Sequence, residues 1–276
     1  MSQFATTLRM MGLTLLMSLA FITQGSAAPK GRKAPKARKA SPLLVQGKNA
    51  IQIIKDVRKR LWDQSSKGEM EMKIVRPSWQ RALKMKIWMK GADYSFVRIL
   101  TPQRERGIAS LKRKSQMWNY MPRAAMVIKV PASMMLSSWM GSDFTNDDLI
   151  RASDILTDYT ATISTQKTKK GVKQAAITLV PKPDAPVVWG KIVMWVRTKD
   201  LQPMSQEYFN EKGKKLRIME FLDHKMMGGR LFPSKLRMRV LSKPGHRTEM
   251  KYLSMQFNQR ISRRVFTLRN LKKKNW

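Results

Sequence analysis

The chain has 276 residues, 42% of them hydrophobic, which is enough for one large domain or two small ones. It contains no cysteine, so disulfides, thiol catalysis, cysteine-ligated zinc and a lipid-modified cysteine are all excluded. Its 55 lysines and arginines stand against 18 acidic residues, a formal net charge of +37, and we therefore expect anionic partners.

Residues 1–28 have the pattern of a secretory signal peptide. Arg9 is the only charged residue before Lys30, the apolar run 10–22 follows it, and small residues lead to a cleavage point after Ala27 or Ala28. The apolar run is shorter than the ~20 residues of a membrane-spanning helix, which favours cleavage over a membrane anchor. We expect the mature chain in the periplasm, where phospholipid headgroups, lipopolysaccharide and acidic glycans supply the anionic surfaces.

Residues 29–46 follow as a disordered basic arm that either keeps the protein soluble or touches a membrane. Its first part, PKGRKAPKARKASP, is rich in proline and positive charge and has no large apolar side chain. The spacing of Ile51, Ile54, Val57 and Leu61 then predicts an amphipathic helix over 50–62, packed against a sheet.

From residue 70 onward the sequence predicts antiparallel strands joined by short turns. Met70, Met72 and Ile74 alternate with other residues, and similar patterns recur as far as Phe257. Segment 154–166 is one predicted strand, and segment 187–198, apolar on both faces, predicts a central strand covered on each side. About eleven strands with two or three helices predict an α+β fold, mainly β, with one strongly curved, half-closed sheet.

Methionine occurs 22 times, and methionine suits surfaces that accept varied apolar partners. The alternative is that these side chains simply close-pack a core. As a set, the methionines and tryptophans on the alternating strand faces favour a lipid-sized cavity. The candidate wall residues are Met85, Ile87, Met89, Trp118, Tyr120, Trp189 and Met194.

The segment 139–149, WMGSDFTNDDL, has residue choices that strand or helix periodicity does not explain, and we interpret it as a loop and short helix across the mouth of the β body. Trp139, Met140, Gly141 and Phe144 are the candidate lid residues, with backbone freedom at the glycine. The acidic side chains that follow are expected to cap a helix.

Thr145 and Asp148 have the spacing of a capping box. A second hypothesis gives Asp143 and Asp148 the role of a latch that pairs with basic rim residues such as Arg123 or Lys129.

No stretch of the sequence reads as an active site. The only two histidines, His224 and His246, lie in no motif, and there is no P-loop, dinucleotide fingerprint or nucleophile elbow. We expect no catalysis, no cofactor and no metal; a hydrolase using one of the histidines is the weakest of the alternatives.

The run from Arg106 to Leu149 resembles the outer-membrane lipoprotein-sorting-like proteins, relatives of the periplasmic Lol carrier. The similarity lies in a “W-Y-P” strand, here Trp118, Tyr120 and Pro122, followed by the “MGSDF…DL” block at 140–149. It extends over later strands to the FTLRNL segment at 266–271. The resemblance implies an unclosed antiparallel β-barrel with helices as a lid over an apolar cavity.

It also implies a carrier that sequesters a lipid, or the acyl chains of a lipoprotein, for transport toward the outer membrane. The partners expected are those acyl chains, an anionic membrane surface and an inner-membrane lipid-exporting permease, with no nucleic acid, and the protein is expected to be a monomer. The alternative is a basic adaptor module that binds anionic glycan, lipopolysaccharide or a membrane surface. The expected organisation is a signal peptide (1–28), a basic arm (29–46), one lipid-binding domain (47–271) and a basic tail (272–276).

Overall fold

The computed structural model describes residues 43–62, 64–151 and 155–273. The expected signal peptide, residues 29–42 of the basic arm and the last three residues of the tail lie outside these described residues. Contacts within the chain group Ser41–Trp276 into one compact unit. Among the described residues, no helix combines the length and the apolar character needed to cross a membrane.

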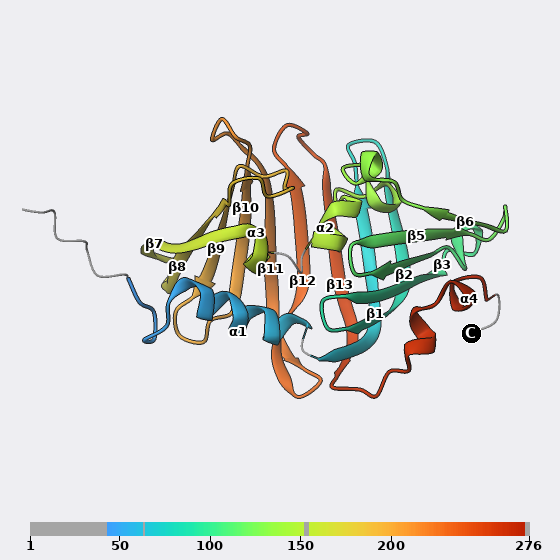
Figure 1. The fold of residues 1–276 in the computed structure, drawn as a ribbon, viewed down its shortest axis with the longest axis horizontal. Helices are drawn as coiled ribbons and strands as arrows, with labels where there is room; N and C mark the ends of the chain where they lie inside the picture. Colours follow the sequence, from blue (N-terminus) through green and yellow to red (C-terminus); the bar gives the residue numbers. More distant parts are fainter. Residues whose placement is uncertain (1–42, 63, 152–154, 274–276) are drawn as a thin grey trace, which may run out of the picture. The chain divides into compact units, whose positions relative to one another are not determined.

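Thirteen antiparallel strands form a single sheet, which confirms the mainly β, curved and unclosed architecture (Figure 1). Their order across the sheet is β6-β5-β4-β3-β2-β1-β13-β12-β11-β10-β9-β8-β7. The strands are β1 (Ser65–Val75), β2 (Gln80–Lys90), β3 (Tyr94–Thr101), β4 (Ala109–Arg113), β5 (Gln116–Met121), β6 (Met126–Lys129), β7 (Tyr159–Lys169), β8 (Val172–Pro181), β9 (Lys191–Arg197), β10 (Pro203–Phe209), β11 (Lys215–Met227), β12 (Arg230–Val240) and β13 (Arg247–Phe257).

The strand order explains why the sheet needs a lid. The first and last strands, β1 and β13, pair in the middle of the sheet, while consecutive strands β6 and β7 form its two free edges. The segment that joins these edges, described over residues 130–151 and 155–158, therefore has to cross the open side. It does so through η2 (Ala132–Met134), η3 (Trp139–Gly141), α2 (Asn146–Arg151) and α3 (Ile155–Asp158). We call residues 139–151 the lid.

The seam between β1 and β13 requires a glycine. A Cβ atom at Gly68 would lie 2.1 Å from the carbonyl oxygen of Ser254, on the neighbouring strand. The register of the two strands shifts one residue later, between Glu69 and Met70. A glycine beside a bulge lets two backbones approach closely and bends the sheet.

The predicted helix is confirmed at its two ends: α1 spans Ala50–Trp62. Asn49 and Gln52 form a capping box, in which each backbone N–H donates to the side-chain oxygen of the other residue, at 2.9 and 3.0 Å. The buried side of α1 packs against the inner face of the sheet; its members are Ile53, Ile54, Val57 and Leu61. Amphipathic spacing was a sufficient signal here because one face of the helix is covered.

The packed domain begins before residue 47. Val45 is buried, and Gln46 Nε2 donates to the carbonyl oxygens of Thr198 and Lys199, at 2.8 and 2.7 Å. The last residues of the segment expected to be a disordered arm are therefore anchored to the turn after β9.

Two predicted strands differ from the structure. Segment 154–166 was expected to be strand throughout, but Ile155–Asp158 forms α3 and β7 begins at Tyr159. Segment 187–198 was expected to be one central strand, but β9 begins at Lys191. Residues 187–190 are apolar because Val187, Val188 and Trp189 line a cavity from a loop, and not because a strand is covered on both sides.

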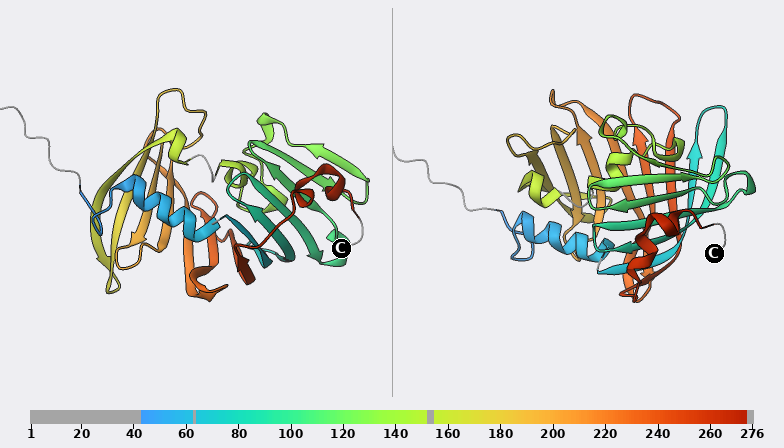
Figure 2. Two further views of the ribbon diagram at one scale, coloured as in Figure 1. Left: turned by 60° about the horizontal axis from the view of Figure 1, so that its bottom comes forward. Right: turned by 45° about the vertical axis from the view of Figure 1, so that its right-hand side comes forward.

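A second, smaller core lies on the outer face of the sheet, where the C-terminal segment covers β3 and β4 (Figure 2). Phe266 and Leu271, from η4 (Arg263–Phe266) and α4 (Leu268–Leu271), pack there. Arg98 donates to the carbonyl oxygens at the end of α4, including that of Leu271 at 2.9 Å. Burial lowers the pKa of Arg98 to about 10, so the guanidinium stays charged at neutral pH.

Candidate functional site

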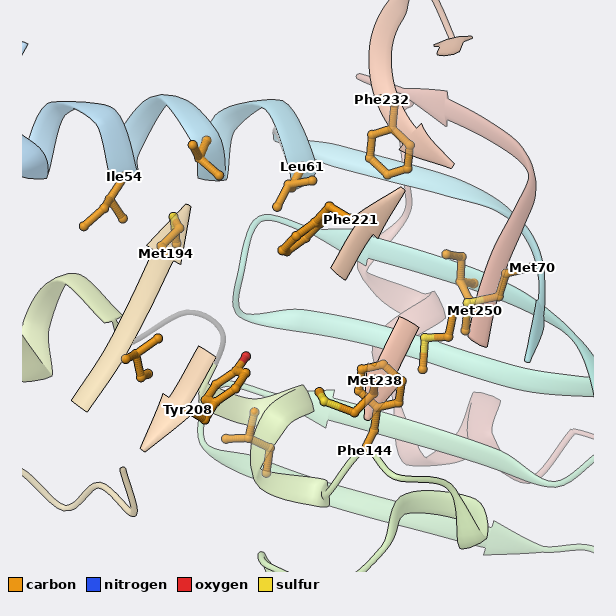
Figure 3. Close-up of a cluster of buried hydrophobic side chains, with 14 of the residues drawn as sticks. Ile54, Leu61, Met70, Phe144, Met194, Tyr208, Phe221, Phe232, Met238 and Met250 are labelled. Carbon is orange, nitrogen blue, oxygen red and sulfur yellow. The ribbon is translucent and has the colours of Figure 1, made fainter. Parts of the chain in front are cut away.

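An apolar cavity of about 230 Å³ lies between the inner face of the sheet, the C-terminal end of α1 and the lid. Figure 3 shows side chains from α1, the central strands and the lid converging on this region. The apolar part of its wall includes Leu61, Met70, Ile87, Met89, Val97, Trp139, Phe144, Leu149, Ile155, Val187, Trp189, Met219, Phe221, Phe232, Leu236, Met238 and Met250. Such a lining favours an apolar guest.

The polar part of the wall lies where the lid meets the sheet. Lys112 Nζ is buried and donates to the carbonyl oxygens of Ala92 and Ile150, at 2.7 and 2.6 Å. Asp147, Asp148 and Asp158 also line this part. Charged groups therefore gather at one side of an otherwise apolar space, an arrangement that fits an amphiphile better than a pure hydrocarbon.

Two tyrosines of the wall are neutral at physiological pH. Burial, together with the Asp148 carboxylate, raises the pKa of Tyr208 well above its ordinary value, and burial raises the pKa of Tyr252 to about 12. The Tyr208 hydroxyl donates to Gln206 Oε1 at 2.8 Å. Neither tyrosine therefore adds a charge to the cavity.

The local structure of the lid follows from its sequence. Met140 and Gly141 both have positive φ, +52° and +72°, so the chain reverses there between two buried aromatic residues, Trp139 and Phe144. The predicted capping box is confirmed: Asp148 Oδ2 accepts from Thr145 N at 2.7 Å, and Thr145 Oγ1 accepts from Asp148 N at 3.2 Å.

Two buried ion pairs fix the lid to the sheet. Asp148 Oδ2 lies 2.6 Å from Arg217 Nη2 of β11, with only 13% and 6% of the two side chains exposed. Asp143 Oδ2 lies 3.0 Å from Arg76 Nη1 and accepts from the Thr248 hydroxyl at 2.7 Å. Both lid carboxylates thus have cationic partners.

These partners differ from the predicted ones. The latch hypothesis named Arg123 and Lys129, but the acids pair with Arg76 and Arg217. The reason is topological, because the fold brings Arg76, which follows β1, and Arg217 of β11 next to the two lid carboxylates.

Backbone hydrogen bonds to arginine strengthen this attachment. Arg217 Nη2 also donates to the carbonyl oxygen of Asp143 at 3.0 Å, and its guanidinium lies over the rings of Trp189 and Tyr208, at 5.3 and 5.5 Å. Arg76 Nη2 donates to the carbonyl oxygen of Gly141 at 3.1 Å. A planar guanidinium suits such a site because it donates in several directions at once.

Trp139 is the apolar anchor of the lid. Its side chain is 1% exposed, and its Nε1 donates to Ser110 Oγ of β4 at 3.0 Å. The lid is therefore held by packing and hydrogen bonds as well as by charge.

The predicted site residues fall into three groups. Ile87, Met89, Trp139, Phe144, Trp189 and Asp148 line the cavity. Met85 and Met194 are buried in the same core, Met140 packs against it, and Gly141 and Asp143 shape and hold the lid. Trp118 and Tyr120 lie on the outer face of β5, in the smaller core.

The placement of Trp118 and Tyr120 follows from strand alternation. Met117, one position away, points to the inner core, so its neighbours point outward. Residues that the sequence reading missed are Leu61, Tyr208, Phe221 and Phe232, all of which line the cavity. The only sequence signal for these four residues is that each lies on the side of its strand or helix that faces the core.

The protein thus belongs to the class of curved antiparallel sheets that carry a lid over an apolar cavity. Comparisons with known proteins give the family. A family model with the description “Uncharacterized protein” matches residues 91–273, two thirds of the chain. No curated protein matches the sequence.

Three solved structures share the fold. A DUF1329 family protein from Desulfovibrio piger is 20% identical, with a TM-score of 0.73 over 80% of this chain and 97% of that chain. A putative outer membrane lipoprotein-sorting protein domain from Vibrio parahaemolyticus is 19% identical, with a TM-score of 0.71 over 81% and 98%. A LolA superfamily protein from Nitrosomonas europaea is 20% identical, with a TM-score of 0.68 over 80% and 99%.

The chain belongs to the family whose model it matches. Its expected resemblance to the outer-membrane lipoprotein-sorting-like proteins is confirmed in the fold. The three structural likenesses themselves concern the fold.

Proposed function

We propose that the protein is a periplasmic carrier that sequesters a lipid, or an acyl chain of a lipoprotein, without catalysing a reaction. The observation that carries this proposal is the apolar cavity under the lid. The fold shared with proteins described as lipoprotein-sorting and LolA superfamily proteins supports it.

The size of the cavity limits what it holds in this conformation. At about 230 Å³ it lies just below the ~300–1,000 Å³ of typical ligand pockets. One acyl chain, or part of one, is the guest that fits. Each buried methylene contributes about 0.8 kcal/mol, so about six of them contribute about 5 kcal/mol before the costs of ordering. A larger cargo requires the lid to move.

The polar rim gives the guest an orientation. The chain lies among the methionines and phenylalanines, while its polar end lies near Lys112 and the lid acids. Export by the N-terminal segment, cleaved after Ala27 or Ala28, delivers the carrier to the periplasm. A lipid-exporting permease of the inner membrane is the donor that the family resemblance implies.

A cavity-filling substitution tests the proposal. Ser95 lies on the inner face of β3 and lines the cavity, so Ser95→Phe places a ring in the space for the guest. The matched control is Thr162→Phe on the exposed outer face of the edge strand β7. Binding is measured with a fluorescent fatty-acyl probe.

Ser95→Phe is expected to weaken probe binding at least about tenfold, a loss of ~1.4 kcal/mol, while Thr162→Phe leaves it unchanged. If both variants bound the probe equally and kept the wild-type melting temperature, the guest would not bind in this cavity.

The basic adaptor is the second candidate, and the net charge of +37 favours it. Raising the salt concentration separates the two functions. Apolar burial survives salt, whereas pairing between surface charges and an anionic glycan is screened.

A further inference from the structure

The hairpin formed by β5 and β6 exposes apolar side chains that the inner core does not use. Met121 and Met126 are direct cross-strand partners at its tip, 41% and 54% exposed, and Ile128 follows on the same face at 46%. Figure 1 shows this tip projecting at the end of the sheet, beyond the neighbouring strands. The chain then continues into the lid through Met134 and Leu136, which are half exposed.

These side chains lie on the hairpin and on the segment that joins it to the lid. Trp139 donates to Ser110, Ser110 donates to Asn119 Oδ1 at 2.6 Å, and Asn119 is the cross-strand partner of Ile128. The hairpin surface is therefore contiguous with the segment that covers the cavity. We define Met121, Met126, Ile128, Met134 and Leu136 as the apolar ledge. Exposed apolar side chains gathered in this way mark an interaction site.

The charge around the ledge has one sign. Residues 106–142, which contain the whole ledge, include Arg113, Arg123 and Lys129 but no aspartate or glutamate. Residues 250–276 also contain no acidic residue. The structure brings these two acid-free segments together, because η4 and α4 pack on β3 and β4 (Figure 2).

Exposed cations from the second segment lie at the same end of the sheet but on its outer face, whereas Met121, Met126 and Ile128 of the ledge lie on the inner-face side, so the two groups flank this end of the sheet. These cations are Arg263, Arg264, Arg269, Lys272 and Lys273. In the middle of the outer face, by contrast, Glu249 contacts the cations Lys235 and Arg237, both at 2.9 Å.

We propose that the apolar ledge, with the cations of the two acid-free segments, docks the protein on an anionic lipid bilayer. Flexible methionine and leucine side chains enter the interface between headgroups and acyl chains, and the lysines and arginines contact the headgroups. Two weak signals, one apolar and one electrostatic, together give reversible attachment.

This geometry does not depend on what the cavity holds, but it serves a carrier well. Docking then involves the end of the sheet that carries both the ledge and these cations, and it brings the segment that leads into the lid close to the membrane. A protein partner is disfavoured as the main occupant because this end of the sheet carries flexible apolar side chains flanked by positive charge of a single sign.

The absence of cysteine permits a clean test. The variants M126C and M226C of the mature chain each carry one thiol, to which an environment-sensitive fluorophore is attached. Met226 is the matched control, since it is 68% exposed on β11 and follows Lys225, but lies outside the ledge. Vesicles of phosphatidylcholine alone are compared with vesicles that also contain phosphatidylglycerol.

The label at residue 126 is expected to shift to shorter wavelength on the anionic vesicles only, and the label at 226 is not expected to shift on either. A serine series gives a second readout by vesicle sedimentation. The variant M121S/M126S/I128S is expected to bind anionic vesicles at least about tenfold more weakly than the control M226S/L241S/L253S, and to lose its remaining binding in high salt.

Three results would overturn the proposal. The first is sedimentation with anionic vesicles without a shift at residue 126, which would assign binding to charge elsewhere. The second is equal binding by both serine variants. The third is no binding to any vesicle while a membrane protein shifts the label, which would assign the ledge to a protein partner. None of these results bears on acyl-probe binding in the cavity, so the two proposals fail separately.

Discussion

Removing the charge of Asp148 tests how the lid is held. In the variant Asp148→Asn the side chain keeps an oxygen that accepts from Thr145 N, so the capping box survives. What is lost is the charge that faces Arg217 at 2.6 Å. The Arg217 guanidinium stays buried, with 6% of the side chain exposed, but it has lost its carboxylate partner.

Breaking a buried ion pair by removing one partner costs about 3–5 kcal/mol of unfolding free energy. Arg217 keeps its hydrogen bond to the Asp143 carbonyl oxygen and its contacts with two aromatic rings, so the lower end, about 3 kcal/mol, is expected. The variant Arg217→Met removes the other charge. The double variant is expected to cost about 2 kcal/mol less than the sum of the two single variants, because the second change removes the charge that the first left unpaired.

Urea unfolding of the four proteins gives these values, and hydrogen exchange at the lid amides shows whether the loss is local. The control is Glu69→Gln, whose pair with Lys84, at 2.9 Å, is exposed by 34% and 42% and should be worth less than ~1 kcal/mol. If Asp148→Asn cost no more than the control, or if the double variant were additive, the lid would not be held by this pair.

Three further predictions concern the anchor, the seam and pH. Trp139→Ala is expected to cost about 3–5 kcal/mol in urea unfolding, since the side chain is 1% exposed, whereas Trp79→Ala, at a 49% exposed position, should stay within ~0.5 kcal/mol. Gly68→Ala is expected to cost more than ~2 kcal/mol, because its Cβ would lie 2.1 Å from Ser254 O; a normal melting temperature would contradict the tight seam. Burial alone would raise the pKa of Glu249, but hydrogen bonds and charges from the β12 cations lower it below its ordinary value. Its contribution is therefore complete above about pH 5 and is lost as the pH falls through the lowered pKa, so the stability difference between wild type and E249Q should shrink on acidification.

Local patterns predicted much of the fold. Helix α1 matches its predicted bounds, because it has one covered face whose periodicity is visible in the sequence. The Thr145–Asp148 capping box was also predictable, since its two residues are three positions apart. In each of these cases the structure is decided within one element.

Long-range features could not be read in the same way. The lid acids pair with arginines that are 67 and 69 positions away in the sequence. These residues come together only after β1 has paired with β13, near the other end of the chain. Trp118 and Tyr120 were assigned to the cavity because they are aromatic residues on a strand with an alternating pattern. The outer face is apolar for another reason, the C-terminal segment packed over it, and alternation alone does not say which face is inside.

The most direct test of the central claim is native mass spectrometry of the mature protein purified from a bacterial periplasm, followed by organic extraction and lipid identification. A carrier predicts one acyl-containing lipid bound per chain, absent from the Ser95→Phe variant and retained by Thr162→Phe. An apoprotein that also fails to take up a fatty-acyl probe would contradict the carrier function and favour the basic adaptor.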